Sequence, residues 1–197
     1  APSSQDCKKP RTAEDILQAY GSVDSEFMNI EIAQKIVAVA ESVGMEDPGW
    51  LANVIYFESA RSFDPGKFNA KTEAIKPGTG ASGLIQFIPS TAEKLGTTIA
   101  ELRQMDSMEQ LDYVEKYFSS YKGRMNSQSD VLAGVFFPKA IGDPGFNIYE
   151  YYVKKNGKEW ADKNYLEPNN GIIYMQEYAN SALAAAKLKC QEDAGNA

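Results

Sequence analysis

Histidine is absent from the sequence, and its absence excludes several classes of enzyme and of metal site. Serine–histidine–aspartate triads, cysteine–histidine pairs and histidine-based zinc sites all need an imidazole. Proton transfer would therefore depend on Asp, Glu, Lys, Tyr or Cys side chains. Nothing else in the sequence points to a cofactor or a metal ion, so we expect neither.

Cysteine is scarce, since the chain has only Cys7 and Cys190, close to its opposite ends. Two cysteines are too few for a metal site, and a CxxC redox motif is missing. Domain termini often lie near each other, so a disulfide is one interpretation and two free thiols are the other. A bridge would stabilise the fold by about 4–5 kcal/mol on the chain-entropy account and would indicate an oxidising compartment.

Positive charge is in the minority, with 20 Lys and Arg against 27 Asp and Glu and a net charge of −7. This balance argues against binding to nucleic acid or to an anionic membrane surface. Long apolar runs are also missing, because no stretch approaches the roughly 18 residues of a membrane span. The chain begins without Met, as a processed or trimmed protein does.

Most of the sequence has a helical pattern, and its 197 residues suit one domain with a substantial core. We expect a mainly α domain over residues 12–189, with loose termini at 1–11 and 190–197. The helices that the apolar spacing predicts span residues 12–20, 30–43, 48–60, 107–121, 128–137 and 171–189.

Several of these helices begin with recognisable capping residues. Thr12 starts one capping box, and Ser107 with Gln110 forms a second. Asp47 and Pro48 suit the N-cap and the first helical position of the third helix.

An insertion follows the third helix, because residues 69–88 are rich in Gly, Ser and Thr. We expect either a long irregular loop or a small β-hairpin there, and such long loops are usually functional. Within it, Gln86 lies between the apolar Ile85 and Phe87. This amide has two interpretations: it binds a neutral polar ligand such as a sugar, or it caps the loop.

Glu58 is an acid where the spacing predicts core. At 100° per residue it falls on the same helical stripe as Leu51, Val54 and Ile55. Desolvation there should raise its pKa and keep it protonated near neutral pH, as a general acid requires. The structural alternative is an ion pair with Arg61, three residues further on.

Two linked motifs resemble those of a known family. Glu58-Ser59 is followed by SGLIQFIPSTA, which starts at Ser82. This combination is similar to the soluble lytic transglycosylases, relatives of goose-type lysozyme, and the clear match covers roughly residues 45–96. The resemblance implies an α+β lysozyme-like fold, with the insertion between its helices.

The resemblance also implies an activity, cleavage of the β-1,4 bond between N-acetylmuramic acid and N-acetylglucosamine in peptidoglycan. By motif position, Glu58 is the catalytic acid, and Ser59 helps to hold the local geometry. Ser82 would contact an N-acetyl group. The residues that would line the sugar cleft are Gly83, Leu84, Ile85 and Gln86.

The chain departs from the family at one motif. Many members carry AYNAG on a later helix, and the counterpart here is VFFPKA, with Phe137 at the Asn position. The family also has a late tyrosine that approaches the catalytic acid. Tyr178 is the better match, with Tyr174 one turn earlier as the alternative.

The product of cleavage depends on a second acid. A lytic transglycosylase needs none and forms a 1,6-anhydro product, which is the outcome that we favour. A hydrolytic muramidase needs a second carboxylate, for which Glu73, fifteen residues beyond Glu58, is the candidate. A further alternative is a non-catalytic glycan-binding or virion structural module.

The substrate implies a setting outside the cytoplasm. The segments QLDYVEKYF and FFPKA look like those of phage virion-associated bacteriolytic members. We therefore expect a phage virion, or else the bacterial periplasm or cell envelope. The expected partners are peptidoglycan strands and phage structural proteins, with the protein itself a monomer. Because the wall is anionic, the cleft should be less negative than the rest of this acidic chain.

Overall fold

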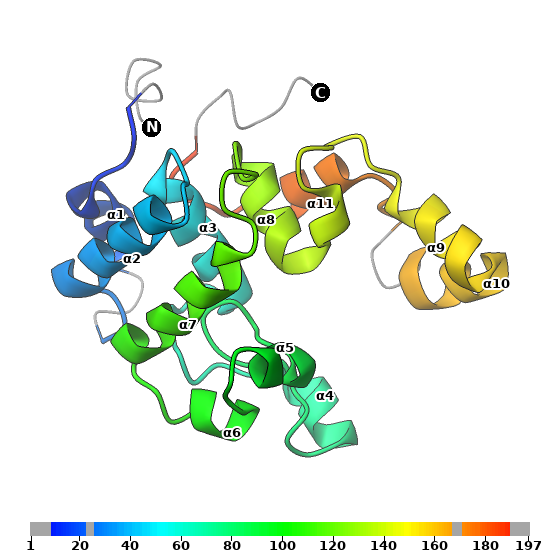
Figure 1. Ribbon diagram of the computed structural model, residues 1–197, viewed down its shortest axis with the longest axis horizontal. Helices are drawn as coiled ribbons and strands as arrows, with labels where there is room; N and C mark the ends of the chain where they lie inside the picture. Colours follow the sequence, from blue (N-terminus) through cyan, green and yellow to red (C-terminus); the bar gives the residue numbers. More distant parts are fainter. Residues whose placement is uncertain (1–8, 23–25, 167–170, 190–197) are drawn as a thin grey trace.

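The computed structural model describes residues 9–22, 26–166 and 171–189, and this part of the chain is mainly helical, as predicted (Figure 1). Its helical elements are α1 (Ala13–Tyr20), α2 (Ile30–Ser42), α3 (Pro48–Glu58), α4 (Ala70–Ile75), α5 (Pro89–Lys94), α6 (Ile99–Leu102), α7 (Ser107–Ser119), α8 (Gln128–Phe136), the 3-10 helix η2 (Pro138–Ala140), α9 (Ile148–Asn156), α10 (Lys158–Ala161), the π-helical turn η3 (Asp162–Leu166) and α11 (Met175–Ala182).

The centre of the fold is α3, which packs between α2 and α8 (Figure 1). Asp47 caps this helix and Pro48 occupies its first turn, as predicted. Every residue from Pro48 to Tyr56 is buried, so α3 is enclosed on all sides rather than along one stripe. Each of its large apolar side chains contributes roughly 1.5–3 kcal/mol by burial. Glu58 therefore lies where a fully buried helix reaches the edge of the core.

The insertion between α3 and α5 contains no β-hairpin within the described residues. Asn69 instead caps the short helix α4, and the extended pairing is limited to the isolated bridges Phe68–Ser82 and Ser82–Phe87. The left-handed backbone of Gly83, at φ +88°, turns the chain away before a ladder can form.

The capping box of Thr12 is confirmed, whereas that of α7 begins one residue earlier than predicted. Asp106, not Ser107, is the N-cap of α7, and Glu109 completes the box. Gln110 is instead fully buried and is used in the core, which explains the difference.

The last helix is much shorter than the predicted 171–189, because α11 ends at Ala182. Beyond it the chain is held by tertiary hydrogen bonds. Lys187 N–H donates to the Tyr20 hydroxyl over 3.0 Å, and the Asn53 amide donates to the Leu188 carbonyl over 2.8 Å. These contacts to α1 and α3 require the segment to leave the helical path.

A single cluster of buried apolar side chains extends from Ala13 to Leu188. The domain boundaries at 12–189 stay a prediction. Within the described residues, no helix has the length and apolar character needed to cross a membrane.

Candidate active site

Glu58 is the last residue of α3, and its side chain is partly exposed. Within the described ranges its carboxyl group has no ion pair or hydrogen bond, so the predicted alternative of pairing with Arg61 is not adopted. Burial alone raises the pKa of Glu58 to about 7. Both the protonated and the ionised form are then populated near neutral pH, as the apolar spacing of the sequence leads one to expect.

Two tyrosines from different helices lie close to this carboxyl group. Burial raises the pKa of Tyr117 in α7 and of Tyr178 in α11, and the negative charge of Glu58 adds to both effects. Tyr178 also stacks on Phe136, with ring centroids 3.7 Å apart and an angle of 9° between the planes. Of the two late tyrosines, the one near the acid is thus Tyr178. Tyr174 is 43% exposed and its backbone forms a bridge with Asn147.

The chain reverses sharply after Glu58, and Ser59 stabilises this turn. Its buried hydroxyl donates to the Ile55 carbonyl over 2.7 Å and accepts from the Phe63 N–H over 2.9 Å. Positive φ angles follow at Ala60, Arg61 and Phe63. Left-handed geometry costs a non-glycine residue about 1–3 kcal/mol and concentrates at functional sites. The role predicted for Ser59, holding the local geometry, agrees with these bonds.

The second motif is held against the core by Gln110, which was predicted as part of a capping box and not as part of the site. Its Oε1 accepts from the Leu84 N–H over 2.6 Å, and its Nε2 donates to the Pro65 and Leu102 carbonyls. A Cβ on Gly83 would lie 2.4 Å from that same Oε1. Only glycine fits there, and the buried Leu84 uses its N–H inside the protein.

Of the two interpretations given to Gln86 from the sequence, the structure shows the loop cap, and the binding of a ligand stays a prediction. Its Nε2 donates to the Lys67 carbonyl over 3.1 Å and to the Gly83 carbonyl over 3.0 Å, so the amide caps the loop. Its φ of +55° turns the side chain to the outside, where it remains partly exposed. Gln86 also belongs to the lining of the groove that contains Ile85.

Ser82, predicted to contact an N-acetyl group, is not exposed to the groove in this structure. Ser82 is fully buried, and its hydroxyl donates to the Gly80 carbonyl over 2.8 Å. The same oxygen accepts from Arg103 Nε over 2.9 Å. The serine therefore organises the insertion and cannot reach a ligand without rearrangement.

Glu73 is not placed as a second catalytic acid. Its carboxylate accepts from Arg103 Nη1 over 3.0 Å and from Arg103 Nη2 over 2.8 Å, and also from the N–H groups of Gly78 and Gly80. These bonds, led by that to Arg103, lower its pKa to about 2. A carboxylate with four donors is a weak base, and here it closes the loop.

Phe137, which the motif resemblance aligns with the family's Asn, is buried. Its ring packs against Phe146, Tyr151 and Tyr152, with centroids 5.2–5.9 Å away. The side chain thus faces an aromatic cluster, and this position contributes no amide to the site.

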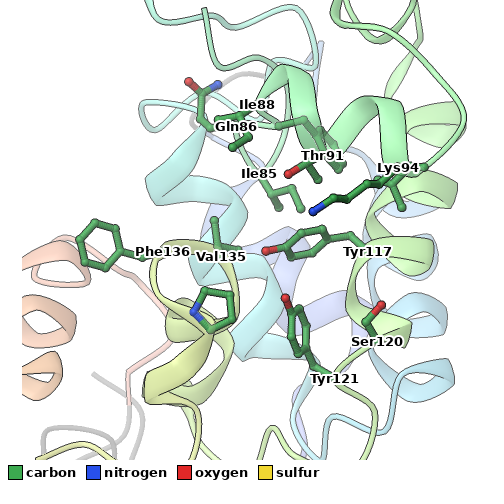
Figure 2. Close-up of a pocket in the computed structure, with 13 residues that line it drawn as sticks. Ile85, Gln86, Ile88, Thr91, Lys94, Tyr117, Ser120, Tyr121, Val135 and Phe136 are labelled. Carbon is green, nitrogen blue, oxygen red and sulfur yellow. The ribbon is translucent and has the colours of Figure 1, made fainter. Parts of the chain in front are cut away.

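A groove of about 510 Å³ begins beside Tyr117 and runs between α5, α7 and α8 (Figure 2). It is lined by Ile85, Gln86, Phe87, Ile88, Thr91, Lys94, Leu95, Tyr117, Ser120, Tyr121, Val135, Phe136 and Pro138. Its lining contains one lysine and no carboxylate, although the chain has a net charge of −7. Glu58 itself is not among these lining residues; it is connected to the groove through Tyr117, which lines the groove and feels the charge of Glu58.

Sequence reasoning selected neither Tyr117 nor Lys94. Tyr117 falls at an apolar position of α7 and is typical of a core aromatic residue by its pattern. The disulfide partners Cys7 and Cys190 lie outside the described residues, so their pairing stays a prediction. In the part of the chain that the structure describes, no group of three or more Cys, Asp or Glu side chains could hold a metal ion.

Comparisons of the chain with models of protein families, with curated proteins and with solved structures found no match.

Proposed function

We propose that this protein cleaves the β-1,4 bond between N-acetylmuramic acid and N-acetylglucosamine in peptidoglycan, and that it does so as a lytic transglycosylase. The proposal combines the motif resemblance with one observation. Within the described residues Glu58 is an unpaired carboxyl group near Tyr117, a residue that lines a groove, and burial raises the pKa of Glu58 to about 7. Perturbed acids in such places are candidates for general acid–base catalysis.

The first step uses the protonated form of Glu58. The acid donates its proton to the glycosidic oxygen, and the bond between that oxygen and C1 of muramic acid breaks. Positive charge develops on the sugar ring, as in other glycosidases. The released strand leaves with the proton on its new hydroxyl group, and Glu58 is left ionised.

The second step returns the proton. The C6 hydroxyl of the same muramic acid attacks C1, and its proton passes to the Glu58 carboxylate. The new bond closes the 1,6-anhydro ring, and no water is consumed. A pKa near 7 suits both steps, because one group must first give and then accept the proton.

The surroundings of Glu73 support this route over hydrolysis. An inverting hydrolase needs a second carboxylate to activate water. Glu73 is occupied by Arg103 and two backbone N–H groups, and no charged group contributes to the pKa shift of Glu58. The substrate would place the protein in a phage virion or in the bacterial cell envelope.

Digestion of purified peptidoglycan followed by mass spectrometry tests the proposal. We expect soluble fragments whose muramic end is lighter by one water than a reducing end. A reducing muramic end would replace the proposal with a hydrolytic muramidase. Binding without any release of fragments would replace it with a glycan-binding or structural module.

A further inference from the structure

Among the residues that the structure describes, Lys94 is the only charged one in the lining of the groove. It is the last residue of α5 and is exposed. Figure 2 shows its ammonium group directed into the groove, between Thr91 and Tyr117. The adjacent Glu93 does not neutralise it, because Glu93 lines a different pocket on the other side of α5.

Five of the cations that the structure describes are paired with carboxylates, and most of the others, like Lys94, are not. Lys35 pairs with Asp112, and Arg103 pairs with Glu73. Within the described ranges, Lys94 forms no ion pair. Lys94 differs from the other unpaired lysines by its place, because it lines a groove without carboxylates on a chain whose net charge is −7.

The neighbours of Lys94 suit an anion as well. The hydroxyl groups of Thr91, Ser120 and Tyr121 belong to the same lining, and hydroxyl groups donate hydrogen bonds to carboxylates (Figure 2). The apolar side chains of Ile85, Phe87 and Ile88 also belong to the lining and offer an apolar surface to the rest of a sugar ring.

We propose that Lys94 forms a subsite for a carboxylate carried by the glycan strand, and so gives the protein a preference for anionic over uncharged N-acetylated glycans. This inference rests on the proposed function. The carboxylate has two sources on muramic acid, which share the same chemistry. One is the lactyl group of a strand without peptides, and the other is a carboxyl group of the attached peptide.

Binding measurements on inactive protein test the subsite. The Glu58→Gln variant is titrated with three soluble tetrasaccharides: an uncharged chitin fragment, a peptidoglycan fragment without peptides, and one with peptides. In this background we expect Lys94→Gln to weaken binding of the anionic fragments about fivefold, the upper range for an exposed ion pair. Binding of the chitin fragment should not change.

Charge reversal and a matched control sharpen the test. Lys94→Glu should weaken anionic binding more than Lys94→Gln, and added salt should reduce both effects. Lys71→Gln removes an exposed lysine of α4, which does not line the groove, and should change nothing. If the Lys94 variants bind the peptide-free fragment more weakly, the contact is assigned to the lactyl carboxylate. A loss confined to the peptide-bearing fragment assigns it to the peptide.

The inference is overturned if Lys94→Gln has no effect, or if it weakens chitin and peptidoglycan fragments equally. Its failure is distinct from that of the proposed function. If the wild-type protein releases fragments but binding does not depend on charge, the subsite alone is contradicted. If binding depends on charge but no fragments are released, the proposed cleavage is contradicted and the subsite stands.

Discussion

Glu58 and Glu73 lie in neighbouring stretches of the chain, but the protein surrounds their carboxyl groups in opposite ways. Glu58 follows a fully buried helix and has no partner within the described residues, and burial raises its pKa to about 7. Glu73 lies in the first turn of the short helix α4, accepts four hydrogen bonds, and has its pKa lowered to about 2. Between pH 5 and pH 6, Glu58 is therefore mostly protonated and neutral, whereas Glu73 is ionised.

The difference separates a group that can exchange protons from one that holds a loop. A general acid needs a pKa close to the working pH, and unsatisfied burial provides it. A structural carboxylate needs permanent charge, and hydrogen-bond donors provide that. The comparison predicts opposite effects of the two substitutions. Glu58→Gln should lose activity and gain stability, whereas Glu73→Gln should keep activity and lose stability.

The largest expected effect is on catalysis. Glu58→Gln keeps the shape of the side chain but cannot donate a proton, so the rate of fragment release should fall at least about 100-fold, as is typical for loss of a general acid. Turbidity loss of purified peptidoglycan measures that rate.

Glu73→Gln is the matched control, because it changes a glutamate of the insertion in the same way. Its activity should stay within about threefold of the wild type, since the contacts that it weakens belong to the loop. An equally large loss in Glu73→Gln, measured below its unfolding temperature, would contradict the division of roles and favour hydrolysis with two acids.

The next effect is a gain in the stability of Glu58→Gln, in contrast to its loss of activity. Below pH 4.5 Glu58 is protonated in both states; above it the unfolded state ionises first, and the folded state follows near pH 7. Wild-type stability therefore falls relative to that of Glu58→Gln over this interval. The difference should reach about 3 kcal/mol at most above pH 7.

Urea unfolding of both proteins at pH 4 and pH 8 measures this difference. The variant should gain little at pH 4 and should be more stable at pH 8. A difference that does not depend on pH would mean that Glu58 titrates alike in the folded and unfolded states. The acid would then lack the environment on which the proposed function depends.

Local signals account for the part of the fold that was predicted correctly. The mainly helical class, the cap of Thr12, and the Asp47-Pro48 start of α3 follow from interactions within a few residues. The wrong predictions came from distant contacts. The end of α11 is decided by Tyr20 and Asn53, which lie far away in sequence.

The same distinction applies to the candidate site. The desolvation of Glu58 could be inferred because its apolar neighbours are on the same helix. The roles of Ser82 and Glu73 could not, because both depend on Arg103, at least twenty residues away in sequence. Nothing local to the serine or the glutamate indicates that this arginine reaches them. Substitution of Glu73 therefore tests whether its contacts with Arg103 stabilise the loop.

The smallest effect is the loss of stability in Glu73→Gln. Because the pKa of Glu73 is lower in the folded state than the usual 4.5, its stabilising contribution is complete above pH 4.5 and disappears as the pH falls toward 2. The variant should unfold at a lower temperature than the wild type at pH 7, with the gap narrowing in acid. Arg103→Gln should reproduce the defect, and the double variant should add little, since both changes break one bidentate pair. Additive losses in calorimetry would show that Arg103 and Glu73 stabilise the loop independently, and that Glu73 is less occupied than its four hydrogen bonds imply.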